Sequence, residues 1–575
     1  MKLTEALKLL QGTSPQNQPY EVLLACGFTP LHLETFLGAH LQRRLTDRCV
    51  KIRKGLYGDV AGTLETGSVF AVALALEWSD LDARLGYRSA GAWNSTVDIV
   101  SSVRMMLHRI EDAISRVSAG VSVAISLPTL SLPPLFHPAG WQISMAELEL
   151  EKLLLEFASS VATRRGCGIV HPGRIGRLSP LEGRYDFKSD LNTGLPYTLA
   201  HADVMGDTLA QLLAPPPPKK GLITDLDDTL WFGIVGEVGP QNVCWDLASH
   251  RQLHGLYQKL LSTLASEGVL VGVASKNDPE IAGQALRRDD ILIQNQKMFP
   301  LEISWNAKSG AVKRILGTWN IGADSVVFVD DSPMELAEVK SAHPGIECVL
   351  FPKDDLKAGY EMLGHLRDWF GKTRLSEEDA LRLESIRQGA SFRATEGGSA
   401  SEEFLEQANA MVTFDFETVA ADPRALDLVN KTNQFNLNGR RISESDWQGR
   451  LARKESIAAT VSYQDRFGPL GKIGVLGGHK TGDSVELDTW VMSCRAFARR
   501  IEHQCIKALF ERYDAAAIRF AFQPTAKNSP IGEMLAGFVD NLTEEPLSIS
   551  REQFEERCPK LYHQVAGLER VSTIF

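Results

Sequence analysis

Gly221-Leu-Ile-Thr-Asp-Leu-Asp-Asp-Thr-Leu-Trp231 is the most informative run of this chain. In it, an apolar, β-prone segment runs straight into Asp225 and Asp227. Successive side chains of a strand point to opposite faces, so the first carboxylate ends the strand and the second reaches the same side after the chain turns. Two such carboxylates can bind a divalent cation and perform nucleophilic and acid–base chemistry. An isolated Asp-x-Asp is more simply an acidic turn. Other residues of the chain are therefore needed to distinguish a turn from a catalytic or metal site.

The residues that follow alternate between strand-like and helical segments. Helices are expected at 252–266, 279–288 and 308–316. Strands are expected between and around them at 222–224, 269–274, 302–304, 325–329 and 347–351. This alternation predicts an α/β fold with a doubly wound parallel sheet, in which ligands bind at the carboxyl ends of the strands.

Polar side chains stand at three more of these strand ends. Ser275 and Asn277 follow the second strand, Lys308 follows the third, and Asp330-Asp331 ends the fourth. Taken singly, Ser275 is usually a helix cap and Lys308 a solvated helix residue. Their joint order after Asp-x-Asp favours one site, formed where neighbouring strands end.

This set suits phosphoryl transfer, which needs a cation, fixed positive charge and donors around the phosphoryl oxygens. Asp225 is the expected nucleophile that forms an aspartyl phosphate, and Asp227 the expected general acid and base. Ser275 and Lys308 are expected to bind the phosphoryl oxygens, with Asn277 as a further substrate-binding candidate.

The same carboxylates predict a Mg²⁺ site. Asp225 and Asp330 are the expected side-chain ligands, and Asp227 contributes its backbone carbonyl. Asp331 is expected to act through a water or to orient a ligand.

The joint pattern resembles the four motifs of the haloacid dehalogenase (HAD) superfamily, which fall here on Asp225, Asp227, Ser275, Lys308, Asp330 and Asp331. Only about 45 and 30 residues separate the successive motifs, which leaves no room for a large cap domain after the first. Within the superfamily, a capless arrangement implies an open site suited to bulky or protein-bound substrates.

From about Lys220 to the C-terminus, the chain is similar to the FkbH-like branch, HAD subfamily IIIC. The stretches that carry this resemblance are Trp231–Gly239, Asn430–Leu437, Asp465–Gly471 and Met492–Arg495. It implies a C-terminal domain with an N-acetyltransferase-like (GNAT-like) fold.

The resemblance also implies a reaction. Family members take 1,3-bisphosphoglycerate, remove phosphate and leave glyceryl as a thioester on the phosphopantetheine of an acyl carrier protein, in polyketide-type biosynthesis. Two alternatives stay open: a plain phosphatase acting on a small metabolite or a phosphorylated carrier, and a non-catalytic scaffold of a biosynthetic complex.

Cys494 is the thiol expected to carry an acyl group, since Arg495 beside it could lower its pKa; the alternative is a buried structural cysteine. Arg495 is also a substrate-binding candidate. The sequence departs from the family at several positions. Ala498 stands in a region where glycines usually follow, which makes close backbone approach to a pantetheine phosphate harder. Phe232 stands where glycine is usual, and Asp228 where Asn is frequent.

Asn433, Gln434 and Asn436 form a dense amide cluster. Amides are costly to bury without partners, so they line a polar substrate pocket or else pin a loop. Arg466 next to Asp465 is a substrate-binding candidate, or one half of a simple ion pair.

The first segment also reads as α/β, with strands expected at 21–26 and 69–74 and helices at 31–45 and 146–163. It is similar in outline to an SGNH-hydrolase-like domain. Its first strand ends in Cys26-Gly-Phe-Thr29, where an active member carries Gly-Asp-Ser. The resemblance therefore implies a non-catalytic docking or assembly module.

The chain length and a proline run predict the domain organisation. A chain of 575 residues predicts about three domains, and the Pro215–Pro218 run marks a stiff linker. The third segment mixes strands at 457–463, 473–477 and 484–490 with helices at 424–431 and 496–513. The predicted plan is 1–214 SGNH-like, 215–220 linker, 221–372 HAD-like, 373–400 helical connector and 401–575 GNAT-like.

Composition and charge bear on the expected location and partners of the protein. The net charge of −11 disfavours non-specific nucleic-acid binding. The eight cysteines are scattered without a Cys-x-x-Cys pair, which indicates reduced thiols. No apolar run approaches the roughly 20 residues that span a bilayer, and the start of the chain lacks a signal-peptide core. We therefore expect a cytoplasmic protein without membrane or nucleic-acid partners.

Overall fold

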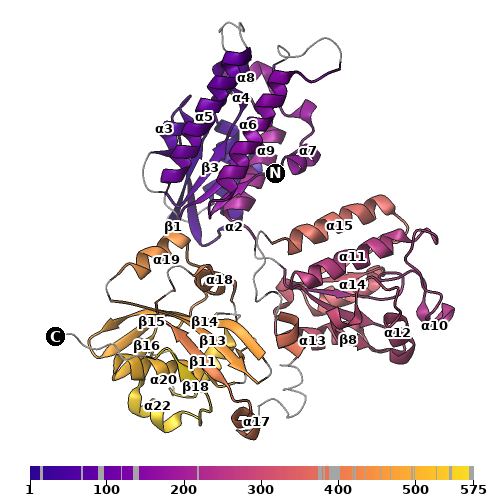
Figure 1. Cartoon of the computed structure of the whole chain (residues 1–575), viewed down its shortest axis with the longest axis vertical. Helices are drawn as coiled ribbons and strands as arrows, with labels where there is room; N and C mark the ends of the chain where they lie inside the picture. The colour runs from indigo at the N-terminus through magenta and orange to yellow at the C-terminus, as the bar shows by residue number, and fades with distance from the viewer. Residues whose placement is uncertain are drawn as a thin grey trace. The chain divides into compact units, whose positions relative to one another are not determined.

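The computed structural model describes the chain apart from a set of short segments. These are residues 13–16, 66–68, 89–95, 118–119, 134–140, 217–218, 373–378, 380–381, 388–401, 418, 420–421, 433, 454, 467, 494–495, 498, 526–527, 540, 543–546 and 569–575. The described strands form three sheets, and each sheet has its own helices (Figure 1). The α/β class predicted for the chain is therefore confirmed.

The first sheet is parallel and has the order β2-β1-β3-β4-β5. Leu23 on β1 packs with α5 and α6, whereas its neighbours Val22 and Leu24 pack with α2 and α9. The alternation along β1 shows that this sheet is buried on both faces. The elements are α1 (Leu3–Gln11), β1 (Gln18–Ala25), α2 (Leu31–Arg44), β2 (Arg48–Lys54), α3 (Val60–Leu64), β3 (Ala71–Ala75), α4 (Trp78–Leu81), α5 (Thr96–Arg116), β4 (Ser122–Ser126), α6 (Met145–Ala162), β5 (Cys167–Ile169), α7 (Pro172–Leu178), α8 (Phe187–Thr193) and α9 (Leu199–Leu213).

The central sheet is also parallel, with the order β10-β9-β6-β7-β8. Leu222 on β6 packs into the layer formed with α11, and Ile223 packs into the layer formed with α13. The elements are β6 (Gly221–Thr224), α10 (Val235–Val238), α11 (Gln252–Ser266), β7 (Leu270–Ser275), α12 (Pro279–Leu286), β8 (Met298–Ile303), α13 (Lys308–Trp319), β9 (Val326–Asp330), α14 (Pro333–Ala342), β10 (Glu347–Leu350) and α15 (Leu356–Phe370). The doubly wound sheet predicted for this segment is confirmed, with small shifts at the ends of its elements.

The third sheet is mixed and has the order β17-β16-β15-β14-β13-β11-β18, with the short β12 paired to β15. The antiparallel run from β13 to β15 forms its centre. The elements are α17 (Glu402–Gln407), β11 (Met411–Asp415), α18 (Pro423–Lys431), β12 (Phe435–Asn436), α19 (Glu444–Leu451), β13 (Ser456–Asp465), β14 (Gly468–Thr481), β15 (Ser484–Met492), α20 (Ile501–Tyr513), β16 (Ala517–Phe520), α21 (Ser529–Ala536), β17 (Leu547–Ser550), α22 (Arg551–Arg557) and β18 (Gln564–Ala566).

One predicted helix starts later than the sequence suggested. The pattern favoured a helix over 496–513, but α20 begins at Ile501. Arg500 lies in the left-handed region, with φ of 59°. A residue in that conformation cannot continue a right-handed helix, so the described residues before Ile501 stand outside α20.

By compactness the chain divides into two units, residues 1–216 with 443–449 and residues 217–442 with 450–575. The division at 216 falls inside the predicted linker at 215–220. The second unit holds two of the three sheets, so separate domains at 221–372 and 401–575 stay a prediction. Most of the predicted connector at 373–400 lies outside the described residues.

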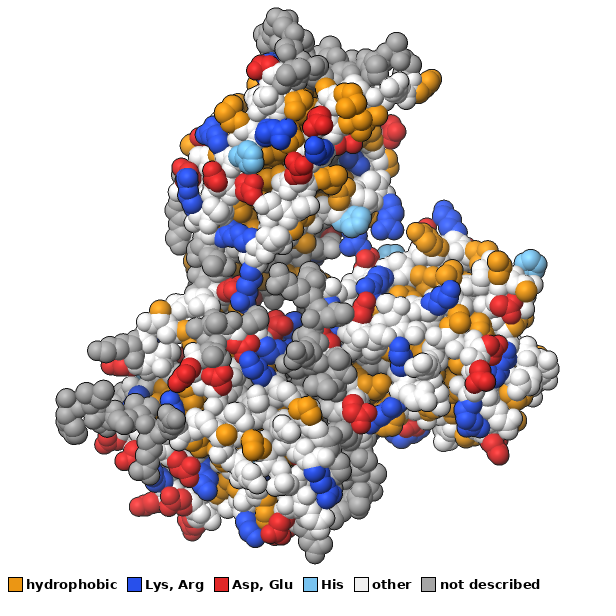
Figure 2. Space-filling model, viewed as in Figure 1, with side chains coloured by type: hydrophobic (Ala, Val, Ile, Leu, Met, Phe, Trp, Pro, Cys, Tyr) orange, Lys and Arg blue, Asp and Glu red, His pale blue; other side chains and the backbone are white. Residues whose placement is uncertain are grey.

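Three further observations concern the surface, the thiols and the apolar character of the helices. Acidic and basic side chains are interspersed over the visible face (Figure 2). The described cysteines are all free thiols: Cys26, Cys49, Cys167, Cys244, Cys348, Cys505 and Cys558. Within the described ranges, no helix combines the length and the apolar character needed to cross a lipid bilayer.

Candidate active site at the edge of the central sheet

The carboxyl edge of the central sheet gathers the polar residues predicted from the strand ends. Asp225 follows β6, Ser275 ends β7, Lys308 opens α13 after β8, and Asp330 ends β9. Their exposed fractions are 5%, 3%, 4% and 0%. Buried ionisable groups are rare unless they are paired or functional. This burial excludes the simpler interpretation of Lys308 as a solvated helix residue.

Lys308 lies between two carboxylates. Its Nζ is 2.9 Å from Asp225 Oδ2 and 2.6 Å from Asp330 Oδ2. The second oxygen of Asp330 accepts a hydrogen bond from the backbone N–H of Ser332 over 2.9 Å. Asp225 Oδ1 is buried and accepts no hydrogen bond from the described residues. One oxygen of Asp225 is therefore held in place while the other is available to a ligand.

Asp227 is held by three donors. Its Oδ1 accepts from Trp231 Nε1 at 2.9 Å and from the backbone N–H of Val235 at 3.1 Å. Its Oδ2 accepts from Asn277 Nδ2 at 3.1 Å, and the same amide group lies 3.0 Å from Ser275 Oγ. Ser275 at the end of β7 and Asn277 after it thus lie beside the predicted general acid and base.

The charges of these buried groups are not balanced. Burial raises the pKa of Asp225 to about 7; Lys308 opposes this rise, and Asp330 adds to it. Burial also raises the pKa of Asp330. Burial lowers the pKa of the Lys308 ammonium, but Asp225 and Asp330 raise it by more. Both carboxylates would therefore be stabilised by additional positive charge.

The residues fit a divalent cation. One carboxylate oxygen from each of Asp225, Asp330 and Asp331 can be chosen so that the three lie within 4.8 Å of one another. Mg²⁺ prefers such oxygen ligands. The free Oδ1 of Asp225 and the excess of carboxylates over ammonium groups provide the acceptor and the charge for it. Asp331, expected to act at a distance, is close enough to be a direct ligand.

Lys353 is a part of this site that the sequence patterns did not bring out. It follows β10, the neighbour of β9, and its Nζ lies 2.6 Å from Asp228 Oδ2 and 2.9 Å from Asp331 Oδ2. Burial lowers the pKa of Lys353, but its hydrogen bonds to the two carboxylates raise it by more. Lys353 stands just after a strand end, as Ser275 and Lys308 stand at or near theirs, but its place in the site follows from the pairing of β10 with β9.

The candidates in the third sheet have different surroundings. Asn436 is buried, its Nδ2 donates to the carbonyl of Thr432, and its Oδ1 accepts from the backbone N–H groups of Asn438 and Gly439. These contacts match the loop-pinning alternative. Gln434 is half-buried, and its Oε1 accepts no hydrogen bond from the described residues.

Asp465 and Arg466 lie in different environments. Asp465 is buried, accepts from Tyr463 Oη at 3.1 Å and has Arg499 Nε at 3.7 Å, whereas Arg466 is exposed. Cys494, Arg495 and Asn433 lie outside the described residues. The acyl-thiol hypothesis and the remaining amide therefore stay predictions.

Comparisons with known proteins bear on the fold. No protein-family model matches the chain, and no curated protein sequence matches it. Among solved structures, the N-terminal part of protein BF1531 from Bacteroides fragilis, described as containing a phosphatase domain complexed with Mg, is 18% identical; the match covers 65% of this chain and 100% of that chain, with a TM-score of 0.53.

Two further structures overlap less. The HAD family enzyme BT-2542 from Bacteroides thetaiotaomicron is 14% identical over 25% of this chain and 98% of its own, with a TM-score of 0.18. An extracellular lipase from Streptomyces rimosus is 12% identical over 34% of this chain and 98% of its own, with a TM-score of 0.23.

The first of these matches bears on the fold alone. Over the matched 65% of its length, this chain shares an α/β fold with the Bacteroides fragilis protein. Only α10 and α11 stand between β6 and β7, in a segment that is described throughout, so no large domain is inserted there.

Proposed function

We propose that the central domain is a Mg²⁺-dependent phosphatase that works through an aspartyl phosphate on Asp225. The observation that carries this proposal is the buried group of Asp225, Lys308 and Asp330, with Asp225 Oδ1 left available. A purely structural ion pair would satisfy both oxygens of a buried carboxylate. The similarity to the Bacteroides fragilis protein, whose phosphatase domain is complexed with Mg, supports the same chemistry.

The first step makes one bond and breaks one. Asp225 Oδ1 attacks the phosphorus, and the bond from phosphorus to the leaving oxygen breaks. Asp227 gives its proton to that oxygen. Lys308 and Ser275 hold the phosphoryl oxygens, and bound Mg²⁺ supplies positive charge to them.

The second step restores the enzyme. Asp227, now a carboxylate, takes a proton from water as that water attacks the phosphorus. The bond from Asp225 to phosphorus breaks, and inorganic phosphate leaves. The bonds from Trp231, Val235 and Asn277 keep Asp227 in place for both proton transfers.

For the whole chain we propose the reaction implied by the FkbH-like resemblance. The substrate is an acyl phosphate such as 1,3-bisphosphoglycerate, and the acceptor is the phosphopantetheine thiol of an acyl carrier protein. The thiol displaces the acyl phosphate as inorganic phosphate, and the Asp225 site hydrolyses the remaining phosphoester. An edge without a cap, which admits a protein-bound substrate, supports this proposal.

The experiment uses the full chain with Mg²⁺, 1,3-bisphosphoglycerate and a holo carrier protein. We expect the carrier to gain a glyceryl mass and phosphate to appear. Asp225→Asn should abolish phosphate release from the phosphoester; a mutant with full release would contradict the assignment of the nucleophile.

The alternatives give different outcomes. Phosphate release without a carrier adduct would favour a plain phosphatase on a small metabolite or a phosphorylated carrier. Binding of the carrier without turnover of any acyl phosphate would favour a scaffold. Asp47→Asn is the matched control, because the Asp47 side chain is 80% exposed in the first sheet's domain.

A further inference from the structure

The first sheet has its own cavity, of about 470 Å³, at the carboxyl ends of its strands. The loops after β1 and β3 meet there, which is where the strand order reverses. Parallel α/β sheets bind their ligands at such a point, and the volume is in the range of small-molecule sites. This cavity belongs to a part of the chain for which no activity has been derived above.

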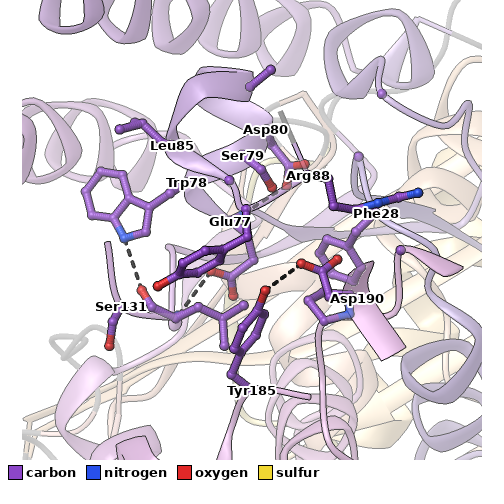
Figure 3. A pocket seen from close by; sticks show the side chains of 18 of the residues that line it. Phe28, Glu77, Trp78, Ser79, Asp80, Leu85, Arg88, Ser131, Tyr185 and Asp190 are labelled. Carbon is purple, nitrogen blue, oxygen red and sulfur yellow. Dashed lines mark hydrogen bonds between the residues drawn. The ribbon is translucent and has the colours of Figure 1, made fainter. Parts of the chain in front are cut away.

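Aromatic side chains form much of its wall. Phe28 follows β1, Trp78 follows β3, and Tyr185 lies across the pocket from Trp78 (Figure 3). Tyr87 also lines the cavity, with its ring centroid 5.4 Å from that of Tyr185. Aromatic faces attract organic cations through their quadrupoles.

The charges in the lining favour a cation as well. Among the described residues, the charged side chains that line the cavity are Glu77, Asp80 and Asp190 against Arg88. Arg88 donates to Tyr57 Oη over 2.6 Å. Carboxyl groups therefore outnumber cationic groups in the lining by three to one.

Glu77 is occupied within the protein. Its carboxylate accepts from Tyr197 Oη at 2.6 Å, from Thr129 Oγ1 at 2.7 Å and from the backbone N–H of Leu130 at 3.1 Å. These bonds fasten the loop after β3 to the loop after β4, so Glu77 has a structural role.

Asp80 is different. Its Oδ2 accepts from the backbone N–H of Glu77 at 2.9 Å, which caps α4. Its carboxylate also accepts from the backbone N–H of Gly27, and its Oδ1 lies so close to Gly27 that a Cβ there would meet it at 2.2 Å. No described lysine, arginine or histidine forms a salt bridge with Asp80. Burial raises the pKa of Asp80 to about 7, as expected for an enclosed carboxylate without a counter-ion.

We propose that this cavity binds a small organic ammonium compound, with the cationic nitrogen at Asp80 and its alkyl groups against the aromatic wall. The ligand supplies the counter-ion that the described residues do not give Asp80. Asp190, bonded through Oδ2 to Tyr185 Oη at 2.7 Å, adds to the negative field. The first domain is then a ligand-binding module, beyond the reaction proposed for the central domain.

The test uses calorimetry to compare how tightly two probes of the same shape bind to the full chain. Choline carries a quaternary nitrogen, and 3,3-dimethylbutan-1-ol has carbon in its place. We expect choline to bind with a Kd of about 1 mM or tighter and the neutral isostere to bind at least about tenfold more weakly. Equal binding of both probes, or no binding of choline at about 10 mM, would overturn the proposal.

Variants locate the site. Asp80→Asn keeps one oxygen that can accept from Glu77, removes the charge and replaces the other oxygen with an amide NH2. Choline binding should fall at least about tenfold, and the melting temperature measured alongside separates this loss from unfolding. Asp47→Asn removes an exposed carboxylate of the same domain and should bind choline like the parent. Undiminished choline binding by Asp80→Asn would contradict the assignment of the nitrogen to Asp80.

Discussion

Lys353 Nζ lies 2.9 Å from Asp331 Oδ2, across the ends of two neighbouring strands of the central sheet. Its other bond, to Asp228 Oδ2 at 2.6 Å, ties the turn after β6 into the same arrangement. Asp228 has a φ of 52°, in the left-handed region. Asp331 is thus shared between a candidate cation site and an ammonium group that belongs to the protein.

This arrangement predicts the effect of Lys353→Met. Without the ammonium, Asp228 and Asp331 add uncompensated negative charge at the metal site. We expect half-saturation by Mg²⁺ at a concentration about threefold to tenfold lower, together with a lower kcat, because Asp331 is no longer held. Phosphatase assays over a range of Mg²⁺ measure both. Lys357→Met, on the exposed start of α15, is the control.

Lys308→Met should lower activity and the melting temperature and should change the response of the melting temperature to Mg²⁺. Removing the ammonium leaves Asp225 and Asp330 buried without a partner, a change that costs about 3–5 kcal/mol in other proteins. We expect a lower melting temperature without metal, a larger rise on adding Mg²⁺ than in the parent protein, and activity at least about 100-fold lower. Lys313→Met on the exposed side of α13 should melt like the parent. An unchanged melting temperature in Lys308→Met would show that this ion pair stabilises nothing.

His201 should make the first domain sensitive to acid. The ring is buried between Thr129 Oγ1 and Ser179 Oγ, each at 2.9 Å, and burial lowers its pKa to about 3. The unfolded chain binds this proton below a pH of about 6.5 and the folded chain does not. Stability is therefore fully present above that pH and falls as the pH drops toward 3, by about 2–3 kcal/mol at pH 4.5.

Melting curves between pH 7 and pH 4.5 test this linkage. His201→Gln keeps hydrogen-bonding groups and loses the titration, so its stability should fall less over the same range. Parallel curves for the two proteins would show that His201 contributes no acid sensitivity.

Asn436→Ala separates the two roles considered for the amide cluster. Its side chain satisfies the backbone N–H groups of Asn438 and Gly439, and losing buried bonds of this kind costs about 1–3 kcal/mol. We expect a lower urea midpoint and unchanged activity per folded molecule. A normal midpoint with a raised KM would instead assign Asn436 to substrate binding.

Much of the central site could be predicted because its residues obey a local rule. A buried strand, its carboxyl end and the next turn are contiguous in sequence, so Asp225, Ser275 and Lys308 could each be placed at an edge. Their convergence needed only the assumption that these strands are neighbours, and the observed order β9-β6-β7-β8 satisfies it.

Other features depend on information that the local pattern does not carry. Lys353 acquires its role from the pairing of β10 with β9, which periodicity does not reveal. Asp465 and Arg466 are adjacent in sequence, yet one is buried and the other exposed at the end of β13. The late start of α20 depends on the left-handed backbone of Arg500, a residue type that gives no warning of it.

The short connection between β6 and β7 has a consequence for selectivity. A hydrolase that lacks its own lid cannot keep bulk water away from its reacting groups. In the reaction proposed above, a docked carrier would supply that shield in trans and would exclude water only when the correct partner is present. Such an enzyme discriminates through turnover more than through affinity, so loose phosphoesters could bind and still react slowly.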